Sequence, residues 1–259
     1  MKTKSSILAV LLVLISSCST PEIQNSDGKV VIKGKVTDYK NNPLMNVSVN
    51  WLDPTFKNDV NVHTDSLGDY SIELEKGLYY CMGAINMDEY PNAGSILPDL
   101  EQRLEFWGWN FIADRDTTYN IKYHRMEIYG VNAFQIQGAA PGYTIYCRPM
   151  ALTRCQVWHS GGDQPGFAAL APSIDKAKIT VTVNDEKVTI KMAQEVKEYF
   201  SDDTYSNAYL LFVDYPEKRT QSPFEIIKIY IEDTENGDKG EATYHFKNDE
   251  YVWLEEDTK

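Results

Sequence analysis

The fold is decided by the stretch from Gly34 to Tyr79, which contains the segments Gly34-Lys-Val-Thr-Asp38, Asn42-Pro-Leu-Met-Asn-Val-Ser-Val49, Thr64-Asp-Ser-Leu-Gly-Asp-Tyr-Ser-Ile72 and Gly77-Leu-Tyr79. Apolar and polar residues alternate in these segments, as they do where one face of a strand is buried and the other is solvated. Asn, Pro, Asp and Gly fall between the alternating parts, and Gly68 is a residue that accepts a positive φ angle. The stretch therefore predicts short strands joined by tight turns.

This pattern resembles the carboxypeptidase regulatory-like domain, a small β-sandwich of the transthyretin type. The resemblance covers about a fifth of the chain. It implies a fold and no chemistry, because a fold of this kind accompanies many different functions.

The rest of the chain continues the period of two into a second domain. With 259 residues, 42% of them hydrophobic, the chain is long enough for two domains with cores. We expect residues 30–123 to form the first β-sandwich and residues 124–259 a second one, Ig-like or jelly-roll-like. The predicted fold class is therefore all-β, with two tandem β-sandwich domains.

Two segments are expected to depart from the strand pattern. Residues 193–200 are the one stretch that favours a helix, and a short one. Residues 154–173 contain the run Trp158-His-Ser-Gly-Gly-Asp-Gln-Pro-Gly166, which predicts a long loop of turn-forming residues.

The N-terminus indicates export. Lys2 and Lys4 precede an apolar run from residue 7 to residue 15. That run is too short to span a bilayer, which takes roughly 20 residues. The following Ile15-Ser-Ser-Cys18 resembles a bacterial lipobox, which implies cleavage before Cys18 and acylation of its thiol. The alternative is an ordinary secretory signal with an incidental cysteine.

On the lipobox interpretation, residues 1–17 are a signal peptide and residues 18–29 a polar tether. The acyl chains would hold the mature protein at an outer membrane or cell surface without a spanning helix. The formal net charge is −13, and it becomes −15 when residues 1–17, with their two lysines, are removed. Such a charge repels nucleic acid and anionic headgroups alike, so we expect no nucleic-acid partner and membrane contact through acylated Cys18 alone.

Three cysteines remain after Cys18. Export makes a disulfide between Cys147 and Cys155 permissible, because the two are close in sequence. Cys81 and Cys147 also fit the buried positions of strands, so buried free thiols are the other interpretation.

The predicted strand at residues 103–112 is apolar on both faces. Leu104, Phe106 and Ile112 are expected on one face, and Trp107, Trp109 and Phe111 on the other. If the first face closes the first sandwich, the tryptophans must be covered by the second domain, another sheet or a ligand.

The binding prediction rests on aromatic side chains. A pyranose ring packs its C–H face on an indole while its hydroxyls bond to neighbouring polar groups. The candidate ligand-binding residues are Trp107, Trp109, Glu105 and Trp158, the last in the Gly-rich run. The alternative is that Trp107 and Trp109 are buried in a core or between the domains.

The chain carries no strong catalytic motif. His124-Arg-Met-Glu127 resembles two of the zinc ligands of metallocarboxypeptidases, and His245 lies downstream. Residues three apart in a strand point to opposite faces, however, and the remaining chain is too short and too poor in helix for that peptidase fold. A pair of glycosidase carboxylates can be neither found nor excluded among 38 acidic residues. We therefore predict no catalytic residue, no metal and no cofactor.

An acidic turn, Asp233-Thr-Glu-Asn-Gly-Asp238, offers oxygens that suit calcium but lacks the spacing of a calcium loop. We interpret it as a hairpin turn.

The expected function is that of a non-enzymatic surface lipoprotein that binds a polysaccharide or glycoconjugate, similar to accessory lipoproteins of glycan uptake systems. One alternative is a structural lipoprotein that docks to an envelope protein, and another is a metal-dependent hydrolase. Exposed indoles at Trp107 and Trp109 would favour the first, and indoles packed between the domains would favour docking.

Overall fold

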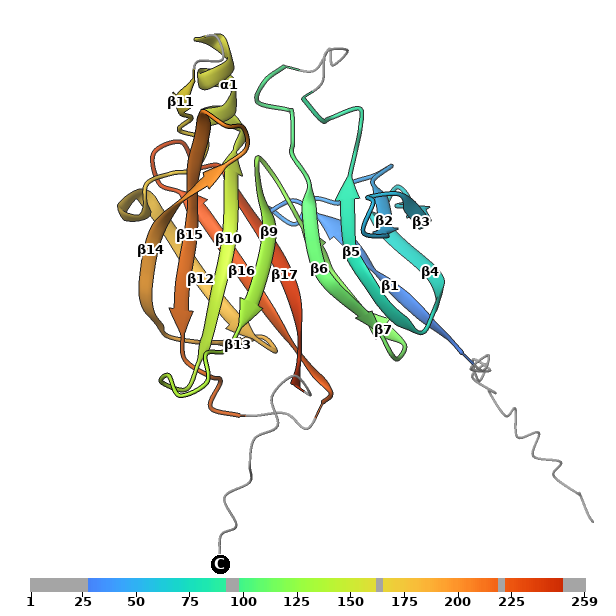
Figure 1. Cartoon of the computed structure of the whole chain (residues 1–259). Coiled ribbons are helices and arrows are strands. Elements are labelled where there is room, and N and C mark those ends of the chain that lie inside the picture. The colour runs from blue at the N-terminus through green and yellow to red at the C-terminus, as the bar shows by residue number, and fades with distance from the viewer. Residues whose placement is uncertain (1–27, 92–97, 162–164, 219–221, 249–259) are drawn as a thin grey trace, which may run out of the picture.

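The computed structural model describes residues 28–91, 98–161, 165–218 and 222–248 (Figure 1). The predicted signal peptide, Cys18 and nearly all of the tether lie outside these ranges. Strands form nearly all of the regular secondary structure in the described residues, which confirms the all-β prediction. Neither of their two helices has the length and hydrophobicity of a membrane-spanning helix.

The first sandwich pairs two sheets around one core. One sheet contains β4 (Asp69–Glu75), β1 (Lys29–Thr37), β7 (Thr117–Thr118) and β8 (Ile121–Lys122). The facing strands are β3 (Asn58–His63), β2 (Ser48–Leu52), β5 (Gly77–Ile85) and β6 (Phe106–Ala113). The largest side chains that are fully buried between them are Trp51, Phe106, Phe111 and Tyr123.

Two glycines let the chain pass close to itself in this sandwich. Gly68 has a φ of +75°, as the sequence predicts, and its amide donates to Asp65 O in the turn before β4. A β-carbon on Gly34 would lie 1.9 Å from the carbonyl oxygen of Tyr119. Gly34 therefore allows the segment between β7 and β8 to lie directly against β1.

The second sandwich also has two sheets. One contains β14 (Ile190–Tyr199), β15 (Thr204–Val213), β10 (Tyr143–Ala151) and β9 (Met126–Phe134), with β11 (Gly166–Phe167) beside the start of β15. The other contains β13 (Glu186–Lys187), β12 (Ala177–Val183), β16 (Phe224–Asp233) and β17 (Lys239–Lys247). The predicted boundary near residue 124 falls between β8 and β9.

The two sandwiches share a sheet. β17 runs parallel to β6, with Ala242 opposite Trp107 and Tyr244 opposite Trp109, so that β13-β12-β16-β17 and β6-β5-β2-β3 form one eight-stranded sheet. Phe106 and Phe111 of β6 lie in the core of the first sandwich, and Trp107 and Trp109 in that of the second. The cores therefore lie on opposite faces of the shared sheet.

The helix predicted at residues 193–200 is wrong: these residues belong to β14 and the bend after it. β14 pairs with β15 from Ile190 opposite Val213 to Tyr199 opposite Tyr205. This long ladder outweighs the modest helix propensity of the segment.

The predicted loop at residues 154–173 is also partly wrong, because α1 (Leu152–Ser160) occupies its first part. A short 3-10 helix, η1 (Ile174–Lys176), follows the loop and leads into β12.

Candidate functional site

The tryptophan pair lies inside the molecule. Trp107 and Trp109 are 8% and 5% exposed, and their rings stack with centroids 5.3 Å apart. The ring of Tyr129 meets both indoles edge-on at 5.4 and 5.0 Å, and Phe56 contacts them from the first sandwich. The indoles therefore join the two sandwiches, which is the buried alternative left open by the sequence, and they offer no face to a sugar ring.

Asn110 explains why the predicted faces of this strand are only partly correct. Its φ is +53°, so the strict alternation breaks there. Phe111 consequently packs in the first core together with Phe106, and not with the tryptophans as predicted.

Glu105, the third predicted binding residue, forms a carboxyl pair with Glu127 beside the indoles. Its Oε1 accepts a hydrogen bond from Trp107 Nε1 at 3.1 Å. Burial raises the pKa of Glu105, and it raises that of Glu127 well above the ordinary range, with a further increase from the charge of Glu105. Of the two groups, Glu127 therefore favours the protonated form more strongly, and the hydrogen bond between them runs from Glu127 as donor to Glu105 as acceptor.

The zinc-like triplet does not assemble. The carbonyl oxygen of His124 accepts from Leu104 N before one end of β6, and His245 Nδ1 accepts from Ile112 N near the other end. Within β6 alone, six residue steps of about 3.3 Å separate Phe106 from Ile112, so these two points lie roughly 20 Å or more apart. No cluster of three possible metal-binding side chains occurs in the described ranges.

His245 is a core residue. Burial lowers its pKa to about 4, and its ring stacks on Phe224. Since Nδ1 accepts a hydrogen bond, the neutral ring carries its proton on Nε2.

The acidic turn between β16 and β17 binds arginines. Asp233 receives Arg154 Nε at 2.6 Å, and Asp238 receives Arg125 Nε at 3.0 Å. The other oxygen of Asp238 accepts from Thr153 N in the first turn of α1, at 2.7 Å. These carboxylates therefore fix α1 against the shared sheet. Their charges are already balanced by guanidinium groups, which gives no support to a calcium site.

Trp158, the fourth predicted binding residue, lies on α1 and not on a loop. It is partly buried, and its ring contacts Phe200, the residue after β14, with centroids 6.2 Å apart. It does not line a described pocket, but its partner Phe200 directly follows Tyr199, a member of an exposed aromatic group.

That group is a row of three rings at the open end of the second sandwich. Phe167 of β11 and Tyr199 of β14 are both direct partners of Tyr205 of β15. Their ring centroids lie 5.6 and 5.3 Å from that of Tyr205, with interplanar angles of 40° and 42°. Phe167 is 50% exposed and Tyr199 57%. We call Phe167, Tyr205 and Tyr199 the aromatic row.

The position of Tyr205 explains why the row is open. Tyr205 shares a strand face with Tyr209, Leu211 and Val213, which are fully buried in the second core. The row thus continues the inner face of the sheet past the point where the opposite sheet covers it. Three aromatic rings left open together indicate an interaction surface.

A groove of about 460 Å³ runs beside the row, within the usual size of ligand sites, roughly 300–1,000 Å³. Phe167 and Tyr205 line it, and its polar wall contains Arg154, Ser173, Glu195, Lys197 and Asn207. Donors and acceptors therefore border an aromatic floor.

Two of these polar groups are held in place. Glu195 accepts from Ile174 N and from Asn207 Nδ2, each at 2.6 Å. Lys197 Nζ lies 4.4 Å from the centroid of the Tyr205 ring, a cation–π distance. We call this groove, with the aromatic row, the aromatic groove.

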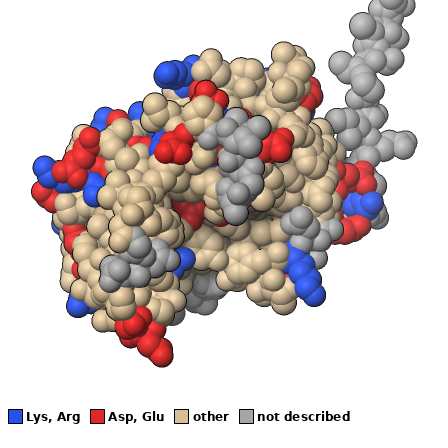
Figure 2. Space-filling model, turned by 90° about the horizontal axis from the view of Figure 1, so that it is seen from above, with Lys and Arg blue, Asp and Glu red and all other residues tan. Residues whose placement is uncertain are grey.

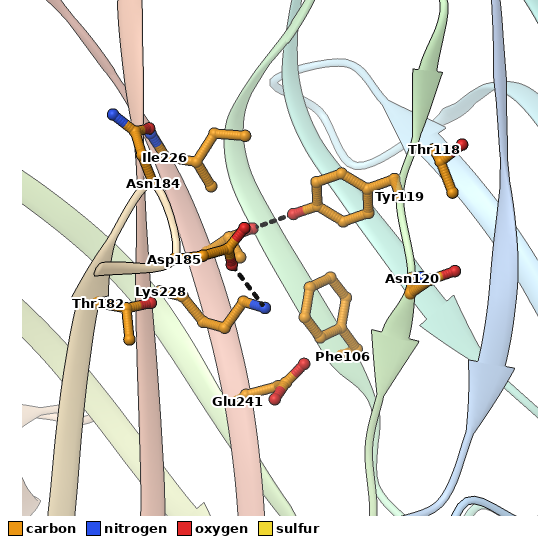
Figure 3. A pocket seen from close by; sticks show the side chains of 11 residues that line it. Phe106, Thr118, Tyr119, Asn120, Thr182, Asn184, Asp185, Ile226, Lys228 and Glu241 are labelled. Carbon is orange, nitrogen blue, oxygen red and sulfur yellow. Dashed lines mark hydrogen bonds and ion pairs between the residues drawn. The ribbon is translucent and has the colours of Figure 1, made fainter. Parts of the chain in front are cut away.

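A second hollow lies at the junction (Figure 3). The hydroxyl of Tyr119, from the first sandwich, bonds there to Thr243 of β17. Lys228 pairs with Asp185 at 3.9 Å on the opposite wall. Its volume of about 210 Å³ is below the usual size of ligand sites. We interpret it as part of the contact between the sandwiches.

The end of the molecule that carries α1 is seen from above in Figure 2. Acidic and basic side chains are interspersed on this face, and no broad basic patch is visible there. This arrangement agrees with the overall acidity of the chain and gives no support to a polyanionic partner.

Sequence reasoning missed the aromatic row because its members are far apart in the chain and only strand register brings them together. The pair Tyr199-Phe200 beside a polar strand was the available signal, and the helix prediction hid it.

The remaining thiols, Cys81, Cys147 and Cys155, are free, so the disulfide permitted between the last two is not formed. Burial raises the pKa of each thiol to about 12.

Comparisons with known proteins show no family for this chain. No family model matches it, and neither does any curated protein. A DUF3823 family protein from Parabacteroides merdae is 10% identical, with a TM-score of 0.27, over 85% of this chain and 98% of that one. A DUF3823 family protein from Bacteroides uniformis is also 10% identical, with a TM-score of 0.27, over 85% of this chain and 99% of that one. The major pilin subunit of Bacillus cereus is 10% identical, with a TM-score of 0.25, over 84% of this chain and 69% of that one. Likenesses at this level carry no argument about function, and the regulatory-like resemblance stays a prediction.

Proposed function

We propose that this chain is a membrane-tethered, non-enzymatic protein that binds saccharide in the aromatic groove. The observation that carries the proposal is the row of Phe167, Tyr205 and Tyr199, half-exposed beside a wall of polar side chains. Apolar C–H faces of a pyranose pack on such rings, and its hydroxyls need the donors and acceptors that border them.

The direction of the groove suits a tethered protein. In Figure 1, β1 begins at one end of the molecule, and α1 and β11 lie at the opposite end. The described chain therefore begins far from the groove, which supports a lipid tether on Cys18 that leaves the groove accessible. The shared sheet and the buried tryptophan pair support a stiff connection between the two ends.

The groove favours binding over hydrolysis. Most glycosidases use two carboxyl groups on either side of the bond that they cleave. Glu195 is the one carboxylate that lines this groove among the described residues, and both of its oxygens already accept hydrogen bonds. We therefore assign no catalytic role to it.

A docking function has one observation in its favour. β14 is ten residues long and, in the part of the chain that the structure describes, pairs only with β15. Such an edge can accept a strand from a partner. Lys191 and Lys197 lie on it, however, and lysines on an edge strand oppose strand addition. Saccharide binding is the better supported function.

The test is a glycan array followed by calorimetric titration of the best oligosaccharide. The protein is the chain from residue 18 with Cys18→Ser, which keeps every described residue. The double variant Phe167→Ser, Tyr199→Ser should lose at least about tenfold in affinity, since each stacked ring contributes around 1 kcal/mol or more. The control is Phe134→Ser, which removes a ring of similar exposure on β9. Equal binding by the double variant and the control, with both folded, would refute the proposal.

A further inference from the structure

We infer that the aromatic groove selects saccharides with an anionic group, carboxylate or sulfate ester, next to the ring that stacks on Tyr205, and that Lys197 binds this group. The inference rests on the proposed function, because it assigns a ligand class to the same groove.

The first ground is that Lys197 has no carboxylate partner among the residues that the structure describes. In the described ranges it forms no ion pair, although the chain has 38 acidic residues against 25 basic ones. The other cation in the groove, Arg154, is already bound by Asp233 and Glu235, each at 2.6 Å. Lys197 is thus the groove cation that is available to a ligand.

The second ground is position. Lys197 of β14 lies opposite Asn207 of β15. This pair is two residues along the strands from the pair Tyr199 and Tyr205, and therefore on the same face of the sheet. Its ammonium group lies over the Tyr205 ring, at the border between the aromatic floor and the polar wall. A sugar stacked on this floor would bring a ring substituent to the ammonium group.

The third ground is that the carboxylate lining the groove, Glu195, is engaged by other donors. Glu195 lies on the same face of β14, and Ile174 N and Asn207 Nδ2 engage its two oxygens. The Asn207 amide also gives the groove a neutral donor near Lys197. An anionic group entering there would meet two donors.

The charge of the whole molecule limits the ligand further. The protein's net charge of −13 repels polyanions over long distances. A saccharide that carries a single anionic group is repelled only weakly. We therefore expect a mostly neutral oligosaccharide with one acidic sugar. Lysine recognises a point charge, so Lys197 alone accommodates both the uronic acid and the sulfate ester.

The test compares matched oligosaccharides on an array: each neutral sequence, its counterpart with one hexose replaced by the uronic acid, and its counterpart with one sulfate ester. The wild-type chain should prefer at least one anionic counterpart by about threefold to fivefold, the range of a solvent-exposed ion pair. Lys197→Gln should abolish this preference, because affinity for the anionic counterpart should fall by about threefold to fivefold more than affinity for the neutral member. Raising the salt concentration should also reduce the preference.

The control is Lys191→Gln on the same strand, whose lysine pairs with Asp214 at 2.6 Å. It should keep the preference. No preference in the wild type, or a preference that survives Lys197→Gln, overturns the inference while ring-dependent binding of neutral sugars keeps the proposed function. Binding that ignores Phe167 and Tyr199, or no binding by any array member, overturns both.

Discussion

Glu127 donates a hydrogen bond to Glu105 between the two sandwiches, so that a buried carboxyl group keeps its proton next to a second carboxyl group. Glu127 is 4% exposed, and one of its oxygens has no hydrogen-bond partner among the described residues. Removing its proton would place two negative charges in contact beside the tryptophan pair. The stability of the junction between the two sandwiches therefore depends on pH.

The first prediction concerns this pH dependence. In the unfolded chain both carboxyl groups ionise near pH 4, and in the folded chain they ionise at higher pH. The folded state thus binds more protons, and the free energy of unfolding must fall as pH rises above about 4. Glu127→Gln should flatten this fall and stabilise the protein at pH 7, by about 1.4 kcal/mol per unit of pKa shift that it removes. Urea unfolding from pH 4 to pH 8 measures it, and a variant less stable at pH 7 would contradict it.

The second prediction separates the two indoles. Trp107 Nε1 donates to Glu105, whereas Trp109 Nε1 has no hydrogen-bond partner among the described residues. Trp107→Phe should therefore destabilise the protein by about 1 kcal/mol more than Trp109→Phe. Chemical denaturation of both variants provides the comparison. Equal losses would mean that the hydrogen bond to Glu105 contributes nothing.

The third prediction concerns α1. Asp238→Asn should cost about 3–5 kcal/mol, because it leaves the buried guanidinium of Arg125 without its counter-charge. It also weakens the acceptor of Thr153 N, so hydrogen exchange at that amide should accelerate. The control is Glu235→Gln, which removes a half-exposed partner of Arg154 and should change stability by less than about 1 kcal/mol. A similar effect of both substitutions would contradict the assigned role of Asp238.

The fourth prediction contrasts two glycines with negative φ angles. Gly34→Ala should destabilise the protein by about 2 kcal/mol or more, since its β-carbon would overlap the carbonyl oxygen of Tyr119. Gly77→Ala should be nearly neutral, because nothing lies within 4 Å of the added carbon. Thermal unfolding of the two variants decides the matter, and a tolerated Gly34→Ala would show that β7 and β8 do not lie as closely on β1 as described.

The strands were predictable because their alternation is a local property of the sequence. The alternation of apolar and polar residues is enough to predict that Ile32, Tyr70 and Leu74 lie in the first core. The two faces of β6 were also visible, up to the positive φ of Asn110. What the pattern could not show was that β17 pairs with β6, which turns two sandwiches in tandem into a fused pair.

The errors fall where distant contacts decide local structure. Residues 152–160 form a helix without a side-chain cap of their own, and Asp238 supplies the acceptor from another hairpin. Residues 193–199 become a strand because each of them pairs with a residue of β15. The aromatic groove depends on that same ladder, so the adjacent Tyr199 and Phe200 could indicate exposed rings but not that Phe167 and Tyr205 join them.

The most direct test of saccharide binding is saturation-transfer-difference NMR with the best oligosaccharide from the array. Saturating the aromatic protons of the protein should transfer most strongly to the C–H protons on one face of a pyranose ring, and the Phe167→Ser, Tyr199→Ser variant should lose this transfer. Transfer of equal strength from that variant would contradict the central claim that the aromatic row holds the sugar.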